Sequence, residues 1–215
     1  MRDTTAPVIE VYADIWCPFT HVGLRAVADQ RARAGRDDVV IRVRAWPLEL
    51  VNGAPMDPTT TEQHANELRE QVAPMLFARL DTDHFPTSTL DALALAERAY
   101  RQDPEVGERM SLALRDALFE EGRDISNRSV LHDIAEAIGV VDPPDPSDAA
   151  AVLADWQSGR ERGVLGSPHF FCGGTDAFCP SLDITKDPGH GLAVTRDTAG
   201  LTRFVARCLA VTGDV

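Results

Sequence analysis

The pattern of apolar and polar residues at the start of the chain predicts a strand, a helix and a second strand. Residues 8–13 are short and rich in β-branched side chains, which is typical of a buried strand. Pro18 directly follows Cys17, and this order favours a helix with Cys17 as its N-cap residue. Residues 39–46 alternate between apolar and polar positions, as a half-exposed strand does. We therefore expect a βαβ unit with a right-handed crossover.

Residues 60–160 change to helical spacing, and no strand pattern interrupts them. The clearest amphipathic stripe runs over residues 106–118. The spacing also predicts one helical face over residues 68–80, with a kink at Pro74. Ser147 is placed to cap the last helix of this block.

Strand signals return at residues 168–172, followed by a Gly-Gly turn and a further strand at 192–195. Residues 201–209 form an amphipathic terminal helix, with Cys208 on its apolar face. The order along the chain is thus βαβ, an all-helical block, a hairpin and a helix.

Composition narrows the possible partners. The chain has 215 residues, and its formal net charge of -13 disfavours binding to nucleic acid or to an anionic membrane. Residues 1–7 are polar, and no apolar run is long enough to span a bilayer. We expect a cytoplasmic protein without a membrane partner, in which the four cysteines are thiols.

Cys17 is the first candidate for chemistry. A sulfur at a helix N-cap faces free backbone N–H groups and the positive end of the helix dipole, which favours the thiolate and lowers its pKa. Thr20 is placed to donate to the sulfur, and Trp16 to cover one side of it. The alternative is an inert cysteine buried in the core.

The segment Trp16–Thr20, taken together with Gly163–Pro168, resembles the DsbA-like branch of the thioredoxin superfamily. This branch includes FrnE-like dithiol oxidoreductases, kappa-class glutathione transferases and 2-hydroxychromene-2-carboxylate isomerases. The resemblance implies an α/β, thioredoxin-like fold with an all-helical insertion. The thioredoxin-like domain would then comprise residues 1–58 and 161–215, and the insertion residues 59–160.

The resemblance also implies the site. Pro168 is expected to form a cis-proline against Cys17, and Ser167 to pair its backbone with an extended substrate. Other residues expected at the substrate are Trp16, Pro18, Phe19 and His169. Members of this group are often dimeric, so a homodimer is expected.

The sequence departs from the dithiol members at Thr20, where they carry a second cysteine. A single thiol forms a mixed disulfide but cannot release it through the motif itself. Three interpretations follow: a small thiol such as glutathione or mycothiol resolves the adduct, Cys172 or Cys179 resolves it, or a small thiol is held noncovalently as a cofactor. The relatives that work in the last way typically carry Ser where Cys17 stands, so the cysteine favours redox chemistry.

The leading hypothesis is a monothiol, DsbA-family thiol–disulfide oxidoreductase with no tightly bound cofactor and with glutathione or mycothiol as co-substrate. Its partners would be a small thiol and a disulfide-containing substrate. The first alternative is a glutathione- or mycothiol-dependent isomerase or transferase acting on a small aromatic substrate, in a pocket where the helical block meets the core. The second is a binding module that has lost the chemistry.

Other polar residues are weaker candidates. Cys179 precedes Pro180 in an expected loop, so it is a better resolving thiol than Cys172 on its predicted central strand, although the two could also pair with each other. His169 and His21 could approach Cys17, or be structural. Asp14 could accept a proton, but a role in a turn is favoured. No metal site is expected, because the sequence has neither a Cys-x-x-Cys pair nor a His-Glu-x-x-His motif.

Overall fold

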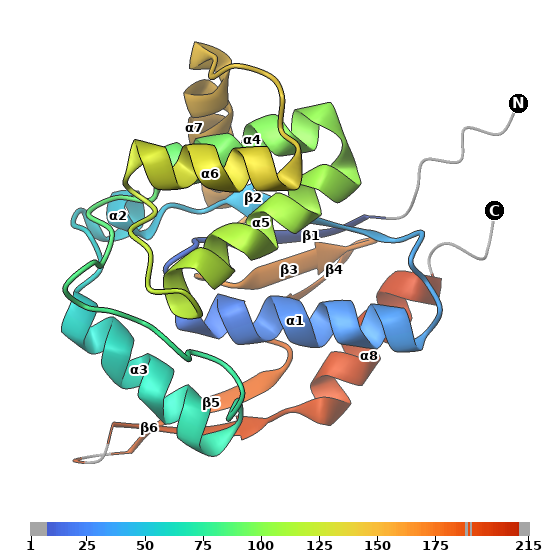
Figure 1. Ribbon diagram of the computed structural model, residues 1–215. Helices are drawn as coiled ribbons and strands as arrows, with labels where there is room; N and C mark the ends of the chain where they lie inside the picture. Colours follow the sequence, from blue (N-terminus) through green and yellow to red (C-terminus); the bar gives the residue numbers. More distant parts are fainter. Residues whose placement is uncertain (1–7, 188, 190, 211–215) are drawn as a thin grey trace, which may run out of the picture.

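The computed structural model describes residues 8–187, 189 and 191–210. Four strands form one mixed sheet in the order β2-β1-β3-β4 (Figure 1). Strand β1 is parallel to β2 and antiparallel to β3, and β4 is antiparallel to β3. The strands are β1 (Val8–Ala13), β2 (Val40–Ala45), β3 (His169–Cys172) and β4 (Thr175–Phe178). This is a thioredoxin-like α/β fold, in which β1 lies in the interior of the sheet and most of its residues are apolar and buried.

Helices pack around the sheet. Helices α1 (Pro18–Arg33) and α8 (Thr198–Ala210) lie together on one side of the sheet, and α4–α7 gather along its β2 edge, with α5 beside α1 (Figure 1). The helices between β2 and β3 are α2 (Leu48–Asn52), α3 (Pro58–Gln71), α4 (Leu90–Gln102), α5 (Pro104–Phe119), α6 (Arg128–Ile138) and α7 (Pro146–Glu161). None of the described helices is long and apolar enough to cross a bilayer.

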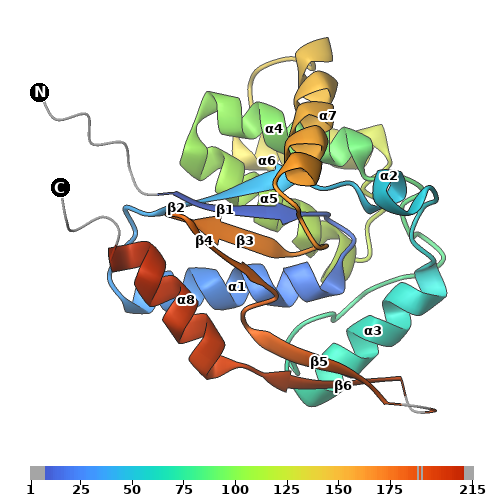
Figure 2. The ribbon, with the colours of Figure 1, turned by 180° about the vertical axis from the view of Figure 1, so that it is seen from behind.

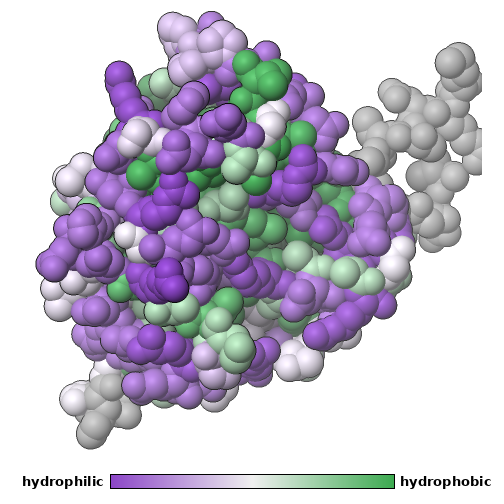
Figure 3. Space-filling model, in the orientation of Figure 1, coloured by the Kyte–Doolittle hydropathy of each residue, from purple (hydrophilic) through white to green (hydrophobic). Residues whose placement is uncertain are grey.

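Helices α5 and α1 meet along a seam lined by Leu24, Ala28 and Leu112. The space-filling view shows a mostly hydrophilic face with apolar surface along this seam (Figure 3). In the ribbon, the end of α5 descends beside the start of α1 (Figure 1). This packing brings the helical block next to the first turn of α1.

A second, two-stranded sheet packs against α3 (Figure 2). It consists of β5 (Leu182–Asp187) and β6 (Gly191–Arg196). The Gln71 side chain holds this sheet against α3. Its amide donates to Leu192 O at 2.9 Å and accepts from Val194 N at 2.8 Å. The sequence predicted a strand at 192–195 but missed its partner.

Two predictions about the helical block are wrong. Helix α3 ends at Gln71 and does not continue through residue 80, because Pro74 lacks the N–H a helix requires there and disfavours helical backbone before it. Met75, placed on the predicted buried face, is 87% exposed. Asp145, not Ser147, caps α7, since its carboxylate accepts the Ser147 N–H at 2.8 Å.

Candidate active site

Cys17 lies at the N-cap of α1, directly after the turn that follows β1. Its carbonyl accepts the N–H groups of Thr20 and His21 at 3.1 and 3.2 Å, so the helix begins at this residue. The Cys17 side chain is nearly enclosed, with 4% of the residue exposed. The local prediction of a strand, a turn and a helix start at Cys17-Pro18 is therefore correct.

The segment before β3 closes over Cys17. The Ser167–Pro168 peptide bond is cis, and Cys17 Sγ donates to the Ser167 carbonyl at 3.1 Å. Pro168 is buried beside α1, where a Cβ added at Gly23 would lie 3.4 Å from Pro168 Cγ. Residues 150 positions apart in the sequence thus form one site.

A chain of hydroxyl groups leads to the sulfur. The Asp14 N–H donates to Ser167 Oγ at 2.9 Å, and Ser167 Oγ lies 2.8 Å from Thr20 Oγ1. Because Ser167 Oγ already accepts from Asp14, its own proton is free to point at Thr20. In that orientation the Thr20 hydroxyl is free to donate to Cys17. A hydrogen bond donated to the sulfur stabilises the thiolate form of Cys17.

Opposing effects act on the Cys17 thiol. Burial raises the pKa of Cys17, and the nearby Asp14 carboxylate raises it further. Hydrogen bonds from the Thr20 and Ser167 side chains and from the Thr20 N–H lower this pKa, but burial outweighs them. The prediction of a lowered pKa at the helix N-terminus is therefore wrong for the thiol as it lies in this structure. A reactive Cys17 needs further stabilisation of its thiolate.

The Asp14 carboxylate accepts hydrogen bonds from three segments around the site. This buried group accepts the Ile15 N–H at 2.6 Å, the Thr89 hydroxyl at 2.7 Å and the Leu48 N–H. Burial raises the pKa of Asp14 to about 6, although these bonds lower it. The carboxylate thus joins the end of β1 to α2 and to the start of α4.

Of the residues expected to contact substrate, Phe19 borders the site, whereas Trp16 is buried away from it. Trp16 is completely buried, and its indole stacks on Phe85 with ring centroids 6.1 Å apart. Its expected contact with substrate is contradicted, because Phe85 covers it. Phe19 is half-buried at the start of α1, with its ring 5.4 Å from that of His64 on α3, so it borders the site. Pro18 is buried in the first turn of α1.

His169 faces away from Cys17. Its Nδ1 accepts the Leu165 N–H at 3.2 Å, and its Nε2 lies 3.0 Å from the Asp176 carboxylate. The ring packs against Phe171 and Phe178. Successive side chains in a strand point to opposite faces, so the residue after Pro168 turns away from the site. The structure assigns His169 to holding this loop in place.

His21 belongs to a buried ion-pair network. Its Nε2 lies 2.6 Å from Glu120 Oε1, and Glu120 also accepts the N–H groups of Phe77 and Ala78. Burial lowers the pKa of His21 to about 4, although Glu120 raises it. Partial burial opposes ionisation of Glu120, yet its three hydrogen bonds hold its pKa at about 2. At neutral pH a neutral imidazole therefore faces a carboxylate.

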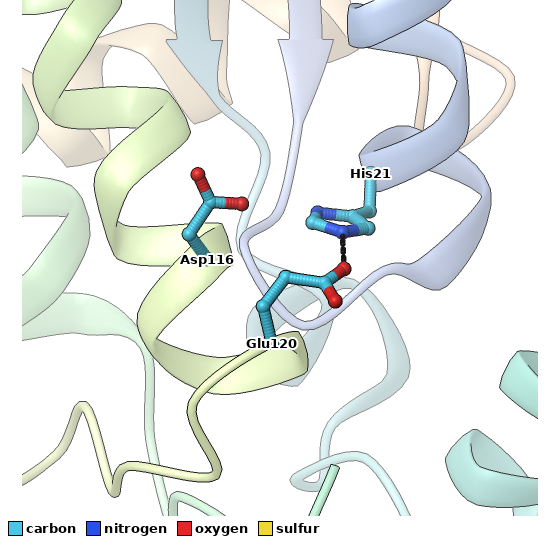
Figure 4. A group of neighbouring side chains, drawn as sticks. All are labelled: His21, Asp116 and Glu120. Atoms are coloured by element: carbon cyan, nitrogen blue, oxygen red, sulfur yellow. Dashed lines mark hydrogen bonds and ion pairs between the residues drawn. The ribbon is translucent and has the colours of Figure 1, made fainter. Parts of the chain in front are cut away.

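Three residues at this network carry side chains of the types that bind metal ions. Ligand atoms of His21, Asp116 and Glu120 lie within 4.8 Å of one another (Figure 4). The Arg25 guanidinium pairs with the Asp116 carboxylate and lies 3.1 Å from His21 Nδ1. Because Arg25 supplies the positive charge here, these residues are explained by ion pairing.

The structure corrects the predicted accessibility of Cys179 and confirms that Cys172 is buried on an interior strand. Cys179 is only 6% exposed, not accessible as predicted, and its N–H donates to the Pro168 carbonyl at 3.1 Å. Burial raises the pKa of Cys179, and so does the charge of the nearby Cys17. Cys172 lies at the other end of β3, roughly 13 Å along the strand from Pro168. This separation argues against Cys172 as a resolving thiol and against a Cys172–Cys179 disulfide. Cys208 is buried, as predicted.

Sequence reasoning missed Arg115 on α5. Its side chain is 0% exposed, and its Nη2 donates to the Asp14 carbonyl at 3.0 Å. Its Nη1 donates to the carbonyl and the hydroxyl of Ser111, each at 2.7 Å. The signal in the sequence was an Arg four residues after Ser111, inside the apolar stripe of residues 106–118.

A cavity of about 550 Å³ opens between α4, α6 and α7. Leu95, Leu131 and Val140 supply part of its apolar wall, and Arg98 and Arg128 part of its polar wall. Cys17 and the segment around Pro168 do not line it. The cavity lies within the helical block, not where this block meets the core beside Cys17.

Comparison with known proteins agrees with this architecture. Residues 8–186 match the DSBA-like thioredoxin domain family. No curated protein matches the sequence. A candidate protein disulfide isomerase from Nitrosomonas europaea superposes with a TM-score of 0.68 at 16% identity, covering 96% of this chain and 98% of that one.

Two further structures share the fold. The cytosolic disulfide reductase DsbM from Pseudomonas aeruginosa has a TM-score of 0.61 at 14% identity, covering 95% of this chain and 99% of its own. DsbM has also been solved with GSH. A 2-hydroxychromene-2-carboxylate isomerase has a TM-score of 0.58 at 12% identity, covering 80% of this chain and 88% of its own.

Proposed function

Because the chain belongs to the DSBA-like thioredoxin domain family, we propose that it is a thiol–disulfide oxidoreductase that acts through Cys17 alone. The observation that carries this proposal is the contact of Cys17 Sγ with the Ser167 carbonyl, 3.1 Å away, beside the Thr20 hydroxyl. The site holds a thiol at a helix start, an extended segment for substrate pairing and no second cysteine in the motif.

The reaction has two exchange steps. The Cys17 thiolate attacks one sulfur of a disulfide, the disulfide bond breaks, and the other sulfur leaves as a thiolate. A small thiol such as glutathione or mycothiol then attacks the substrate sulfur of the mixed disulfide. This step forms a new disulfide and returns Cys17 as a thiolate. The DsbM structure with GSH supports a small thiol of this class as co-substrate.

Residues around Cys17 have separate roles in these steps. The Thr20 hydroxyl donates to the thiolate while it is attacking or leaving, and the Ser167 hydroxyl, which donates to Thr20, orients the Thr20 hydroxyl. The backbone of Ser167, next to the cis bond, pairs with an extended segment of the substrate. Phe19 borders the entering group. A cytoplasmic location and a homodimer remain predictions.

Cys179 gives the monothiol proposal its sharpest competitor. Its thiol is close enough to Cys17 to respond to the Cys17 charge, and its N–H is bound to the Pro168 carbonyl. Burial of Cys179 and its raised pKa oppose attack on a mixed disulfide at Cys17. We therefore propose that an external thiol, not Cys179, regenerates the enzyme.

A second candidate is a thiol-cofactor isomerase or transferase, favoured by Thr20 in place of a second cysteine. Such an enzyme keeps its small thiol intact and needs no nucleophile at position 17. Binding of glutathione that persists in Cys17→Ser, together with isomerase turnover, would favour this candidate. The cavity in the helical block does not reach Cys17, which favours the redox proposal.

Turnover of a small disulfide at the expense of glutathione tests the proposal. We expect the wild-type protein to be active and Cys17→Ser to be inactive. Cys179→Ser and Cys172→Ser should retain activity within about twofold, because neither thiol takes part. Loss of turnover in Cys179→Ser with the fold intact would replace the monothiol mechanism by an internal dithiol one.

A further inference from the structure

Arg115 is a buried cation with no carboxylate within salt-bridge distance in the part of the chain that the structure describes. Its hydrogen bonds go to three neutral oxygens: two on Ser111 and the carbonyl of Asp14. Its Nε has no partner among the described residues. A guanidinium in a protein interior normally requires a paired anion, because desolvation of its charge is costly. Its position here calls for a compensating negative charge.

Two of the ionisable groups whose charge influences Arg115, Asp14 and Cys17, belong to the active site. Burial lowers the pKa of Arg115 to about 10, and the charges of Asp14, Tyr100 and Cys17 raise it in return. The Asp14 carboxylate points elsewhere, to Thr89 and to two backbone N–H groups. Attraction between charges is mutual, so the same guanidinium stabilises an ionised Cys17.

Hydrogen bonds connect Arg115 to the turn that carries Cys17. Arg115 Nη2 holds the Asp14 carbonyl at 3.0 Å, and Asp14 lies three residues before Cys17 in the turn after β1. The N–H of Asp14 holds Ser167 Oγ at 2.9 Å. Arg115 therefore supports the backbone from which the hydroxyl chain to Cys17 begins.

Titratable groups surround the site on several elements. Asp14 comes from the turn after β1, and Cys179 from the loop after β4. On the helices, His21 has a pKa lowered to about 4, and the pKa of His64 is also lowered, so both imidazoles are neutral at neutral pH. Arg115, from α5, and Arg25, from α1, are cations of this set, and Arg25 is already paired with Asp116.

We propose that Arg115 is a positioning residue that stabilises the Cys17 thiolate by placing a buried positive charge behind the turn from Asp14 to Cys17. This inference deepens the proposed function and rests on it. It gives the helical insertion a part in catalysis, because α5 supplies this charge beside a turn of the thioredoxin-like core. A positive charge here also offsets the free-energy cost of ionising Cys17, a thiol whose pKa is raised by burial.

The pH profile of Cys17 alkylation by iodoacetamide, followed by mass spectrometry of the Cys17 peptide, tests this proposal. Arg115→Met should shift the midpoint upward by about one pH unit, the size expected for loss of a nearby opposite charge. The Cys17 alkylation rate below the midpoint should fall about tenfold, since one unit is a tenfold change in thiolate. Arg115→Lys should keep the wild-type midpoint, because it keeps the charge.

Arg31→Met serves as the matched control. Arg31 is mostly buried, and it pairs with Glu108 near the far end of α1. Its removal should leave the Cys17 midpoint unchanged. If Arg115→Met leaves the midpoint unchanged, or if Arg115→Lys shifts it as far as Arg115→Met does, the charge role is wrong.

Two further measurements keep the test decisive. If Arg115→Met does not fold, as judged by circular dichroism, Arg115→Gln replaces it, and the same upward shift is expected. Alkylation reports the thiolate whether or not the protein turns over disulfides. A protein with the Arg115 shift but no turnover would overturn the proposed function, whereas turnover without the shift would overturn the role of Arg115.

Discussion

Thr20 occupies the position at which a second cysteine resolves mixed disulfides in dithiol relatives, and its hydroxyl lies 2.8 Å from Ser167 Oγ. At this scale the site is a buried thiol with a few donors. Burial raises the pKa of Cys17, and the Thr20 and Ser167 side chains lower it. Small changes in these donors therefore set how much thiolate is available.

Thr20→Val removes the hydroxyl and keeps the shape of the side chain. A hydrogen bond to a charged group contributes about 1.5–3 kcal/mol, so the pKa of Cys17 should rise by about one to two units. Thr20→Ser keeps the hydroxyl and should stay near the wild-type value. The pH dependence of the Cys17 alkylation rate gives the pKa of Cys17 in each variant. Identical profiles for Thr20→Val and Thr20→Ser would show that the Thr20 hydroxyl has no part in the mechanism.

At the scale of helices and strands, close approaches hold the helical block on the sheet. A Cβ added at Gly159 on α7 would lie 2.6 Å from Trp46 Cζ3 and 2.9 Å from Tyr12 Cδ1. The absence of a side chain at this position lets α7 pack directly against the sheet. Gly23 on α1 is different, since its nearest neighbour would lie at 3.4 Å.

Gly159→Ala should destabilise the fold by about 1–3 kcal/mol, because the added methyl group displaces two buried rings. Gly23→Ala is the matched control on another helix. There the methyl group fits, and the higher helix propensity of Ala should leave stability unchanged or raise it by up to about 1 kcal/mol. Urea unfolding of the two variants compares them, and equal destabilisation would refute the packing argument.

Periodicity predicted the elements with a strong local pattern and missed those set by distant contacts. The strand at residues 8–13, the helix after Cys17 and the stripe over residues 106–118 depend on residues close in sequence. Strand β5 depends on packing of its hairpin against α3, which no local pattern records. The same holds for Asp145 as a cap, where the choice between Asp145 and Ser147 depends on where Pro146 begins the helix.

At the scale of the whole molecule, the site is assembled from parts distant in sequence. Cys17 could be predicted from its place before Pro18 at a helix start, and Ser167 and Pro168 from the resemblance of their segment to a known family. Arg115 could not, because only the fold places α5 beside the turn after β1. The burial of Trp16 under Phe85 could not be predicted either, because the fold brings these two residues together from distant parts of the sequence.

Charge burial also links the stability of the whole protein to pH. The pKa of His21 is about 4 in the folded protein, against an ordinary value of 6.5, chiefly because of burial. The unfolded chain therefore takes up a proton at His21 before the folded protein does. Stability is lost as pH falls from about 6.5 towards 4. Asp14 acts in the opposite direction, because its raised pKa favours the folded protein as pH falls below about 6.

His21→Gln should remove the first of these effects. Between pH 7 and pH 5 the His21 contribution amounts to about 2 kcal/mol, so the variant should lose that much less stability than the wild type over this interval. Urea unfolding of both proteins at the two pH values measures the difference. Equal losses would show that His21 does not remain neutral in the fold.

The most direct test of the central claim is mass spectrometry after reaction with glutathione disulfide and acid quenching. The account predicts one glutathione per chain, attached to Cys17, absent in Cys17→Ser, retained in Cys179→Ser, and released by added glutathione. A disulfide between Cys17 and Cys179, or a wild-type Cys17 that stays free while another cysteine takes up the label, would contradict it.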